Sequence, residues 1–337
     1  MSAPTLPRSP SPRDWHVPGL IDVYEARRHI QPHLRATPLF LYPALDELVG
    51  TAVYVKHENH HPVGAFKVRG GVNLVSQSSA EERARGFICA STGNHGQSIA
   101  FAARIFGARA IIVCPENANP VKVASMRGLG AEIIHFGPDF DAAREHCEAL
   151  AREHGYRYVH SGDEPLLIAG VGTIYLEMLE EQPDLDVVFV PIGGGSSAGA
   201  ACIVAAEMKP SLRVVGVQSE AAPAAYRSWR ERALLEDTTR TYAEGLATRT
   251  PFELPQRIMW ELLQEFMLVS EEELRTAQAH MIRTTRNLTE GAGAAPLAAA
   301  LRMRDELRGK KVGLVLSGGN ASPEQLLDVL AASQPAM

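Results

Sequence analysis

The sequence predicts an α/β protein made of two three-layer lobes whose sheets are mainly parallel. Short apolar stretches alternate with helical patterns from about residue 86 to residue 161, and the alternation resumes in a second unit. Strands that alternate with helices pair in parallel, because each helix crosses over the sheet to the next strand. The 337 residues also suffice for two domains or one large α/β unit.

The first unit contains four strand candidates and three helix candidates. The first helix carries apolar residues at helical spacing and ends at Gly107, and Gly155 follows the third. The strands read "GFICAST", "ARAIIVCPE", "AEIIHFG" and "YRYVHSG", and the helices read "HGQSIAFAARIFG", "NPVKVASMRGLG" and "DFDAAREHCEALAREHG".

The second unit surrounds the first in the sequence. Its strand candidates are "AVYVKHE", "DVVFVPIGGG", "LRVVGVQSE" and "KKVGLVLSGGN", and alanine-rich helical stretches lie at 197–208 and 293–306. We therefore expect a flexible proline-rich arm at residues 1–18 and a large domain formed by residues 19–85 and 162–337. A small domain, residues 86–161, is inserted in the large one.

Composition excludes several classes of function. The net charge is −6 and no block of lysine and arginine occurs, so we expect no nucleic-acid partner. No apolar run approaches the roughly 20 residues of a membrane helix, and because the first 18 residues contain no apolar core we expect them not to be a secretion signal. The cysteines have no paired spacing, which indicates reduced thiols in a cytoplasmic protein: Cys89, Cys114, Cys147 and Cys202.

Glycine-rich segments follow several of the predicted strands. "PIGGGSSAGA", residues 191–200, links a strand to a helix, and Gly193–Gly195 lack side chains, so their amides can approach an anion closely. Ser196 and Ser197 add hydroxyls, and the helix dipole favours negative charge. This arrangement suits a phosphate, although a turn without a ligand has the same pattern.

Two further segments lie at strand ends. "STGNHG", residues 91–96, opens a helix, and Thr92, Asn94 and the free amides there suit a carboxylate or a ring hydroxyl. "SGGN" ends the last strand, with Ser317 as donor and acceptor. Because open α/β sheets bind ligands at the carboxyl ends of their strands, we expect these segments to share one site. Taken singly, each is also an ordinary helix cap or turn.

The segment "GAFKVRGG", residues 64–71, places Lys67 in small, apolar surroundings at the start of a helix. A desolvated lysine loses proton affinity and becomes a nucleophile that can form a Schiff base with an aldehyde cofactor. The alternative from the residues alone is an ordinary surface lysine.

Along the chain the four segments occur in the order "GAFKVRGG", "STGNHG", "PIGGGSSAGA" and "SGGN". In this order they resemble the fold-type II pyridoxal-phosphate (PLP) enzymes, most closely the threonine/serine dehydratase and serine racemase group. "RATPLF" at 35–40 and "TEGAGAAPLAA" at 289–299 are similar to segments of the same group, so the resemblance covers residues 20–332. It implies a tryptophan-synthase-β-like fold, PLP as the cofactor, a small amino acid as substrate and a homodimer.

The resemblance also implies roles for individual residues. Lys67 matches the lysine that binds PLP as a Schiff base, and Phe66 matches the aromatic residue that lies against the cofactor. Asn94 matches the side chain that hydrogen-bonds the 3-oxygen of the ring. Gly193, Gly194 and Gly195 match the phosphate loop, together with Ser196, where many relatives carry a fourth glycine.

Ser317 matches the hydroxyl at the pyridine nitrogen. A serine there, in place of a carboxylate, makes the ring a moderate electron sink and favours β-elimination, with Lys67 as the base for the Cα proton. The expected products are a 2-oxo acid and ammonia. The start of the following helix is expected to hold the substrate carboxylate through Ser91, Thr92, Asn94 and His95.

Two departures from the group bear on function. Thr92 stands where the racemases carry a catalytic serine, and its methyl group crowds that position, which disfavours racemisation. Gln218 and Ala224 stand where the group's divalent-metal site has acidic residues, so we expect no metal site.

We therefore predict a PLP-dependent ammonia-lyase that dehydrates a β-hydroxy-α-amino acid. L-Threonine or L-serine is the default substrate. A bulkier substrate such as phenylserine or a hydroxylated compatible-solute derivative stays open, as do an amino-acid racemase and a non-catalytic ligand-binding protein.

Overall fold

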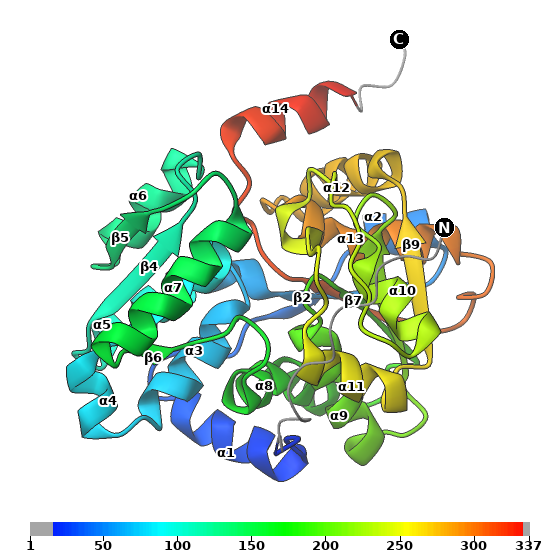
Figure 1. The fold of residues 1–337 in the computed structure, drawn as a ribbon. Coiled ribbons are helices and arrows are strands. Elements are labelled where there is room, and N and C mark those ends of the chain that lie inside the picture. Colours follow the sequence, from blue (N-terminus) through cyan, green and yellow to red (C-terminus); the bar gives the residue numbers. More distant parts are fainter. Residues whose placement is uncertain (1–15, 333–337) are drawn as a thin grey trace.

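The computed structural model describes residues 16–332, and most of the arm expected at residues 1–18 lies outside them. A six-stranded sheet has the order β1-β2-β10-β7-β8-β9, and a four-stranded sheet has the order β5-β4-β3-β6. All pairs are parallel except β1 with β2. Figure 1 shows the small sheet on the left and the large sheet on the right. The two sheets confirm the predicted α/β class with mainly parallel pairing.

The strands of the large sheet come from both ends of the chain. They are β1 (Leu39–Leu41), β2 (Ala52–His57), β7 (Val187–Pro191), β8 (Arg213–Ser219), β9 (Glu265–Val269) and β10 (Lys311–Leu316). Those of the small sheet form one continuous stretch: β3 (Phe87–Ala90), β4 (Ala110–Cys114), β5 (Glu132–His135) and β6 (Arg157–Tyr158).

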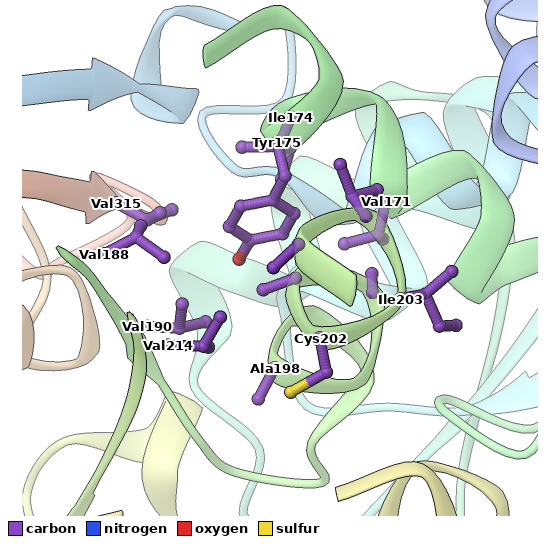
Figure 2. Packing of buried hydrophobic residues seen from close by; sticks show 14 of the residues in the cluster. Val171, Ile174, Tyr175, Val188, Val190, Ala198, Cys202, Ile203, Val214 and Val315 are labelled. Carbon is purple, nitrogen blue, oxygen red and sulfur yellow. The ribbon is translucent and has the colours of Figure 1, made fainter. Parts of the chain in front are cut away.

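Helices cover both faces of the large sheet. Successive strand residues such as Val188 and Phe189 belong to different core clusters, as expected for side chains that alternate between faces. Figure 2 shows one core, in which Tyr175 and its neighbours pack between helices and strands. One face carries α8 (Pro165–Glu181), α9 (Ser196–Met208) and α11 (Glu253–Leu262), and the other carries α2 (Pro43–Val49), α12 (Glu271–Thr285) and α13 (Gly291–Arg302).

The small sheet is also sandwiched between helices. Phe87 and Cys89 of β3 belong to one core cluster, and Ile88 and Ala90 to another. One face is covered by α7 (Phe140–His154), and the other by α5 (Asn94–Ile105) and α6 (Pro120–Gly128). Helices α1 (Leu20–Ile30) and α3 (Lys67–Ser76) contribute to the same core cluster as α5 and α6. The remaining elements are η1 (Glu58–His60), α4 (Ala80–Arg85), α10 (Ala224–Glu231), η2 (Glu244–Leu246) and α14 (Pro323–Ala332).

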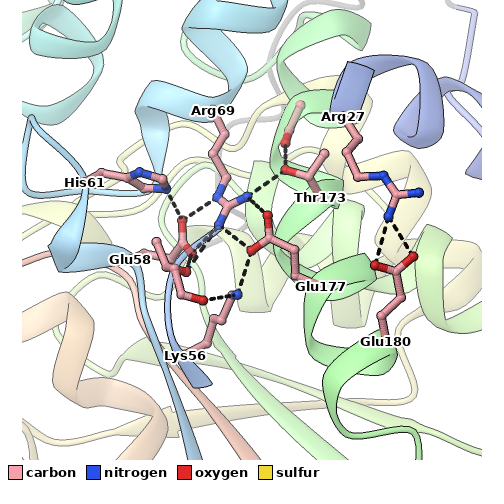
Figure 3. Close-up of polar contacts among 10 residues, drawn as sticks. Arg27, Lys56, Glu58, His61, Arg69, Thr173, Glu177 and Glu180 are labelled. Carbon is pink, nitrogen blue, oxygen red and sulfur yellow. Dashed lines mark hydrogen bonds and ion pairs between the residues drawn. The ribbon is translucent and has the colours of Figure 1, made fainter. Parts of the chain in front are cut away.

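A buried ionic network anchors helix α3 (Figure 3). Arg69, only 1% exposed, donates to the carboxylates of Glu58 at 2.7 Å and Glu177 at 2.6 Å. Lys56 also pairs with Glu177, at 2.6 Å. Burial would raise the pKa of Glu58, but Arg69 holds that pKa well below its usual value. Since a buried charge is costly unless paired, this network fixes α3, and with it Lys67, against β2 and α8.

The structure also differs locally from the sequence expectations. β1 and β9 were not predicted, because β1 has only three residues and β9 lacks strict alternation of buried and exposed positions. The helix expected at 293–306 ends at Arg302. Among residues 16–332, no helix has both the length and the apolar character needed to cross a bilayer.

Candidate active site

A large cleft, with a volume of about 1620 Å³, is lined by residues from both sheets and their connecting loops. Its lining includes the carboxyl-terminal side of three parallel strands, β3, β7 and β10. All of the site residues expected from the sequence line this cleft: Phe66, Lys67, Ser91, Thr92, Asn94, His95, Gly193, Gly194, Gly195, Ser196 and Ser317.

Lys67 begins helix α3 and points its amino group into the cleft. Nζ donates to the carbonyl oxygen of Ser161 at 2.8 Å and to Oγ of Ser196 at 3.2 Å. It also lies 5.4 Å from the centre of the Phe66 ring. Burial lowers the pKa of Lys67 to about 8, because an ammonium ion loses hydration in this setting. About one tenth of the amine is therefore neutral and nucleophilic at pH 7, far more than for an ordinary lysine.

The glycine-rich loop between β7 and α9 leaves no room for side chains. A Cβ atom on Gly193 would lie 2.3 Å from the carbonyl oxygen of Gly245, and one on Gly194 would lie 1.8 Å from the Phe252 ring. Gly195 has a φ of +89°, which favours glycine. Ser196 opens the 13-residue helix α9, so the loop presents backbone amides and a helix N-terminus to the cleft.

Asn94 begins helix α5 and is held on two sides. Its Nδ2 donates to Oε1 of Glu290 at 2.9 Å, and its Oδ1 accepts from Nδ2 of Asn320 at 2.8 Å. Ser317, directly after β10, is 2% exposed, and its carbonyl oxygen accepts from the backbone N–H of Phe66 at 3.0 Å. The segments that follow β3 and β10 thus meet beside the turn that carries Lys67.

The segment expected to bind the substrate carboxylate has a stiff framework. Oγ of Ser91 accepts from the backbone N–H groups of Gly93 at 3.1 Å and Gly96 at 2.8 Å, which shapes the turn. Nε2 of His95 donates to the carbonyl oxygen of Val159 at 3.1 Å. Burial, reinforced by Lys67, lowers the pKa of His95 to about 3, so its ring is neutral. Thr92 lines the cleft beside them.

Sequence reasoning missed three polar residues at the site, Glu290, Lys122 and Asn320. Burial raises the pKa of Glu290, and Lys122 and Asn94 act in the opposite direction. Lys122, on α6, forms an ion pair with Glu244, in η2. Asn320 bonds Asn94. The one available signal was a lone acid, Glu290, among small residues in "TEGAGAAPLAA".

Gln218 and Ala224 stand at the two positions where the resemblance places metal-binding acids, and both side chains are buried. Oε1 of Gln218 accepts from the backbone N–H of Tyr226 at 3.0 Å. Among the described residues, no group of three or more histidine, cysteine or acidic side chains is arranged to hold a metal ion.

Comparison with known proteins supplies the family. Residues 30–318 match the family model described as pyridoxal-phosphate dependent enzyme. The chain belongs to this family. The match confirms the resemblance read from the four segments, and it establishes PLP as the cofactor.

Named relatives of this PLP enzyme include lyases. The L-threonine ammonia-lyase of Thermotoga maritima is 39% identical over 302 residues, which cover 89% of this chain and 75% of the relative. The L-threo-3-hydroxyaspartate ammonia-lyase of Saccharomyces cerevisiae is 35% identical, over 94% of this chain and 98% of the relative.

Solved structures share the fold. The processed form of threonine deaminase isoform 2 from Solanum lycopersicum has a TM-score of 0.89 and 28% identity, with 94% of this chain and 92% of that chain covered. Serine racemase from Dictyostelium discoideum has a TM-score of 0.85 and 31% identity, with coverages of 90% and 99%. These likenesses confirm the predicted fold class.

The cleft fits PLP on its own geometry. It offers an amine with a lowered pKa at Lys67 for the aldehyde of the cofactor. It also offers a side-chain-free loop at a helix N-terminus for the phosphate. The volume of the cleft, about 1620 Å³, leaves space for a substrate beside the cofactor.

Proposed function

We propose that this protein is a PLP-dependent ammonia-lyase that removes water from a β-hydroxy-α-amino acid, with L-threonine or L-serine as substrate. The unsaturated amino acid left by this elimination takes up water again when it hydrolyses, so the final products are a 2-oxo acid and ammonia. The observation that carries the proposal is Lys67, whose amine has a pKa lowered to about 8 and lies 3.2 Å from Ser196 at the glycine-rich loop. Relatives named threonine ammonia-lyase or dehydratase, 35–39% identical, support this reaction.

Several residues would hold the cofactor. Lys67 would bind its aldehyde carbon, Gly193–Gly195 and Ser196 its phosphate, and Asn94 and Ser317 the polar atoms of its ring, against Phe66. When bound, PLP withdraws electrons from the Cα atom of the substrate and so makes the Cα proton acidic.

The chain itself then moves the proton and orients the substrate. The amine of Lys67, whose lowered pKa makes its neutral form accessible, takes the Cα proton. The N-terminus of α5, with Ser91, Thr92, Asn94 and His95, would bind the carboxylate, since free backbone N–H groups and the helix dipole favour an anion there.

An amino-acid racemase is the second candidate, because solved racemases share this fold at 31–32% identity. Racemisation needs a second proton-transfer group on the face opposite Lys67, and Thr92 is the residue expected there. Its methyl group makes elimination the better-supported reaction. Release of the opposite enantiomer from L-serine would favour the racemase.

Further features of the molecule belong to the same proposal. We infer a homodimer in the cytoplasm, with a large domain of residues 19–85 and 162–337 and a small domain of residues 86–161. The position of the small sheet, within residues 87–158, supports this division.

The decisive experiment traps the cofactor and follows the product. Borohydride reduction of the purified protein should fix PLP on the peptide that contains Lys67, and a panel of L- and D-β-hydroxy amino acids should be assayed for 2-oxo acid release. Lys67→Ala should lose both signals. Lys209→Ala, which alters a lysine bonded to the carbonyl oxygen of Pro183 outside the cleft, should keep both. Normal turnover by Lys67→Ala would refute the proposal.

A further inference from the structure

Asn320 joins three segments that meet at the cleft. Its Nδ2 donates to the carbonyl oxygen of Val63 at 2.8 Å and to Oδ1 of Asn94 at 2.8 Å. Its backbone N–H also lies close enough to the carboxylate of Glu290 to lower the pKa of that group. Asn320 therefore contacts the turn that precedes Lys67, the start of α5 and the start of α13.

These bonds determine which way round the amide of Asn94 lies. A backbone carbonyl only accepts, so the bond to Val63 requires the nitrogen of the Asn320 amide on that side. The second N–H of the same nitrogen needs an acceptor, and Oδ1 of Asn94 supplies it. Nδ2 of Asn94 then faces the carboxylate of Glu290, which is also an acceptor, at 2.9 Å.

The result is a donor directed toward the cleft. Within the described part of the chain, the bonds to Glu290 and Asn320 use one N–H of Asn94 and its oxygen. The second N–H is left for the cleft that Asn94 lines. A flipped amide would instead present an oxygen, which repels a negatively charged ring oxygen.

The place of Asn320 is itself well determined. The backbone N–H of Gly319 donates to the carbonyl oxygen of Gly64 at 2.9 Å, and Ala65 and Gly318 form an antiparallel bridge. Gly64 has a φ of +67°, and a Cβ atom on it would lie 2.6 Å from Oδ1 of Asn320. The side chain of Asn320 thus fits against a glycine that no larger residue could replace without strain.

We propose that Asn320 is a positioning residue for the cofactor. It holds the Asn94 amide with an N–H toward the ring oxygen of PLP, and it keeps Asn94 in register with the turn that carries Lys67. The proposal rests on the proposed function, in which Asn94 binds that oxygen.

The test uses Asn320→Asp, which keeps the shape of the side chain but replaces the double donor by an acceptor. The dissociation constant of PLP is measured by equilibrium dialysis, and the visible absorption band of the bound cofactor is recorded. We expect about tenfold weaker binding and a shifted band, because a hydrogen bond to a charged oxygen is among the stronger ones. The matched control is Asn287→Asp, a half-buried asparagine whose Nδ2 donates to the carbonyl oxygen of Thr285 at 2.8 Å. It should change affinity less than about twofold.

A double-mutant cycle separates positioning from a general structural effect. In the Asn94→Ala background, Asn320→Asp should change PLP affinity less than about twofold, because its effect acts through Asn94. If the same tenfold loss persists in that background, the inference is wrong. If Asn320→Asp does not fold, Asn320→Ala decides: weaker PLP binding supports the inference, and unchanged binding and absorption refute it.

The outcomes also separate this inference from the proposed function. A wild-type protein that binds PLP but releases no 2-oxo acid contradicts the proposed reaction and leaves the Asn320 measurements valid. A normal wild-type lyase with an unaffected Asn320→Asp variant contradicts only the role of Asn320.

Discussion

At the scale of single residues, the chemistry depends on how the fold changes the pKa of one amine. Lys67 lies in a cleft whose nearest polar contacts, the Ser161 carbonyl and the Ser196 hydroxyl, carry no full charge. Burial therefore lowers its pKa without an opposing carboxylate among the causes. The same side chain on a solvated helix face would have a pKa of about 10.4, so its neutral fraction near pH 7 would be more than a hundredfold smaller, by order of magnitude.

The lowered pKa predicts how PLP adds to the cofactor-free protein. Only the neutral amine reacts, so the rate should rise about tenfold per pH unit below pH 8 and level off above it, since the pKa of Lys67 is about 8. Stopped-flow absorbance between pH 6.5 and 10 measures this rate. Nα-acetyl-lysine serves as the reference, and its rate should keep rising toward pH 10. A protein profile that follows the reference would contradict the altered pKa.

Gln218 supports a second prediction at this scale. Its amide oxygen accepts from the backbone N–H of Tyr226, and no carboxylate stands at this position or at Ala224. We expect exhaustive chelation to leave the rate of 2-oxo acid release within about twofold, because hard divalent cations prefer carboxylate ligands. A loss of activity that magnesium or manganese restores would show that a metal is needed.

At the scale of elements, the loop between β7 and α9 depends on neighbours far away in the sequence. Phe252, just before α11, lies where a side chain on Gly194 would be, and Gly245 lies against Gly193. The segment that ends at Phe252 therefore packs closely against the glycine-rich loop and restricts its conformation.

This packing predicts opposite effects for two glycines. Gly194→Ala should lower the free energy of unfolding by about 1–3 kcal/mol and weaken PLP binding, because the new Cβ overlaps the Phe252 ring. Gly199→Ala, within α9, meets its nearest atom at 3.6 Å and should be neutral or stabilising by about 0.5–1 kcal/mol. Urea unfolding and PLP titration measure both.

A second variant, at Phe252, tests whether the overlap with its ring causes the effect of Gly194→Ala. Phe252→Ala should recover part of the PLP affinity lost in Gly194→Ala, since it removes the overlapping ring. If Gly194→Ala matches Gly199→Ala in both measurements, Phe252 does not limit the loop.

At the scale of the whole molecule, two ion pairs cross from the helices of the small sheet to the segment 232–252. Lys122 of α6 pairs with Glu244, and Asp141 of α7 pairs with Arg249 at 3.3 Å. The side chain of Lys122 is only 11% exposed, whereas that of Glu244 is 42% exposed. All four residues line the cleft, so these pairs hold the two walls of its mouth together.

Breaking the first pair should loosen this segment. Glu244→Gln keeps the shape but leaves the ammonium of Lys122 without this partner, so we expect a loss of about 1 kcal/mol in stability and faster deuterium uptake over residues 232–252. Arg308→Gln breaks an exposed pair with Asp305, at 2.9 Å, and is the control. Equal uptake in both variants would show that the pair does not restrain the cleft.

The α/β class and most of the candidate site follow from the amino-acid sequence alone. Strand and helix periodicities are local, and parallel strands place their carboxyl ends at one edge of a sheet. Lys67, Asn94, the glycine-rich loop and Ser317 could therefore be assigned to one cleft from their positions along the chain, with the resemblance supplying the chemistry. Strands β1 and β9 were not predicted from the sequence, since short strands at the sheet edges carry little periodic signal.

The packing of distant segments determines which side chains surround and support that site. Lys122 and Glu244 are 122 positions apart, and Asn94 and Asn320 are 226 apart. Nothing in the local pattern around either partner indicates such a pair, because contacts between distant segments depend on how helices pack against the two sheets. The size of the pKa shift at Lys67 depends on the same packing, since the burial that causes it is complete only when distant segments close around the side chain.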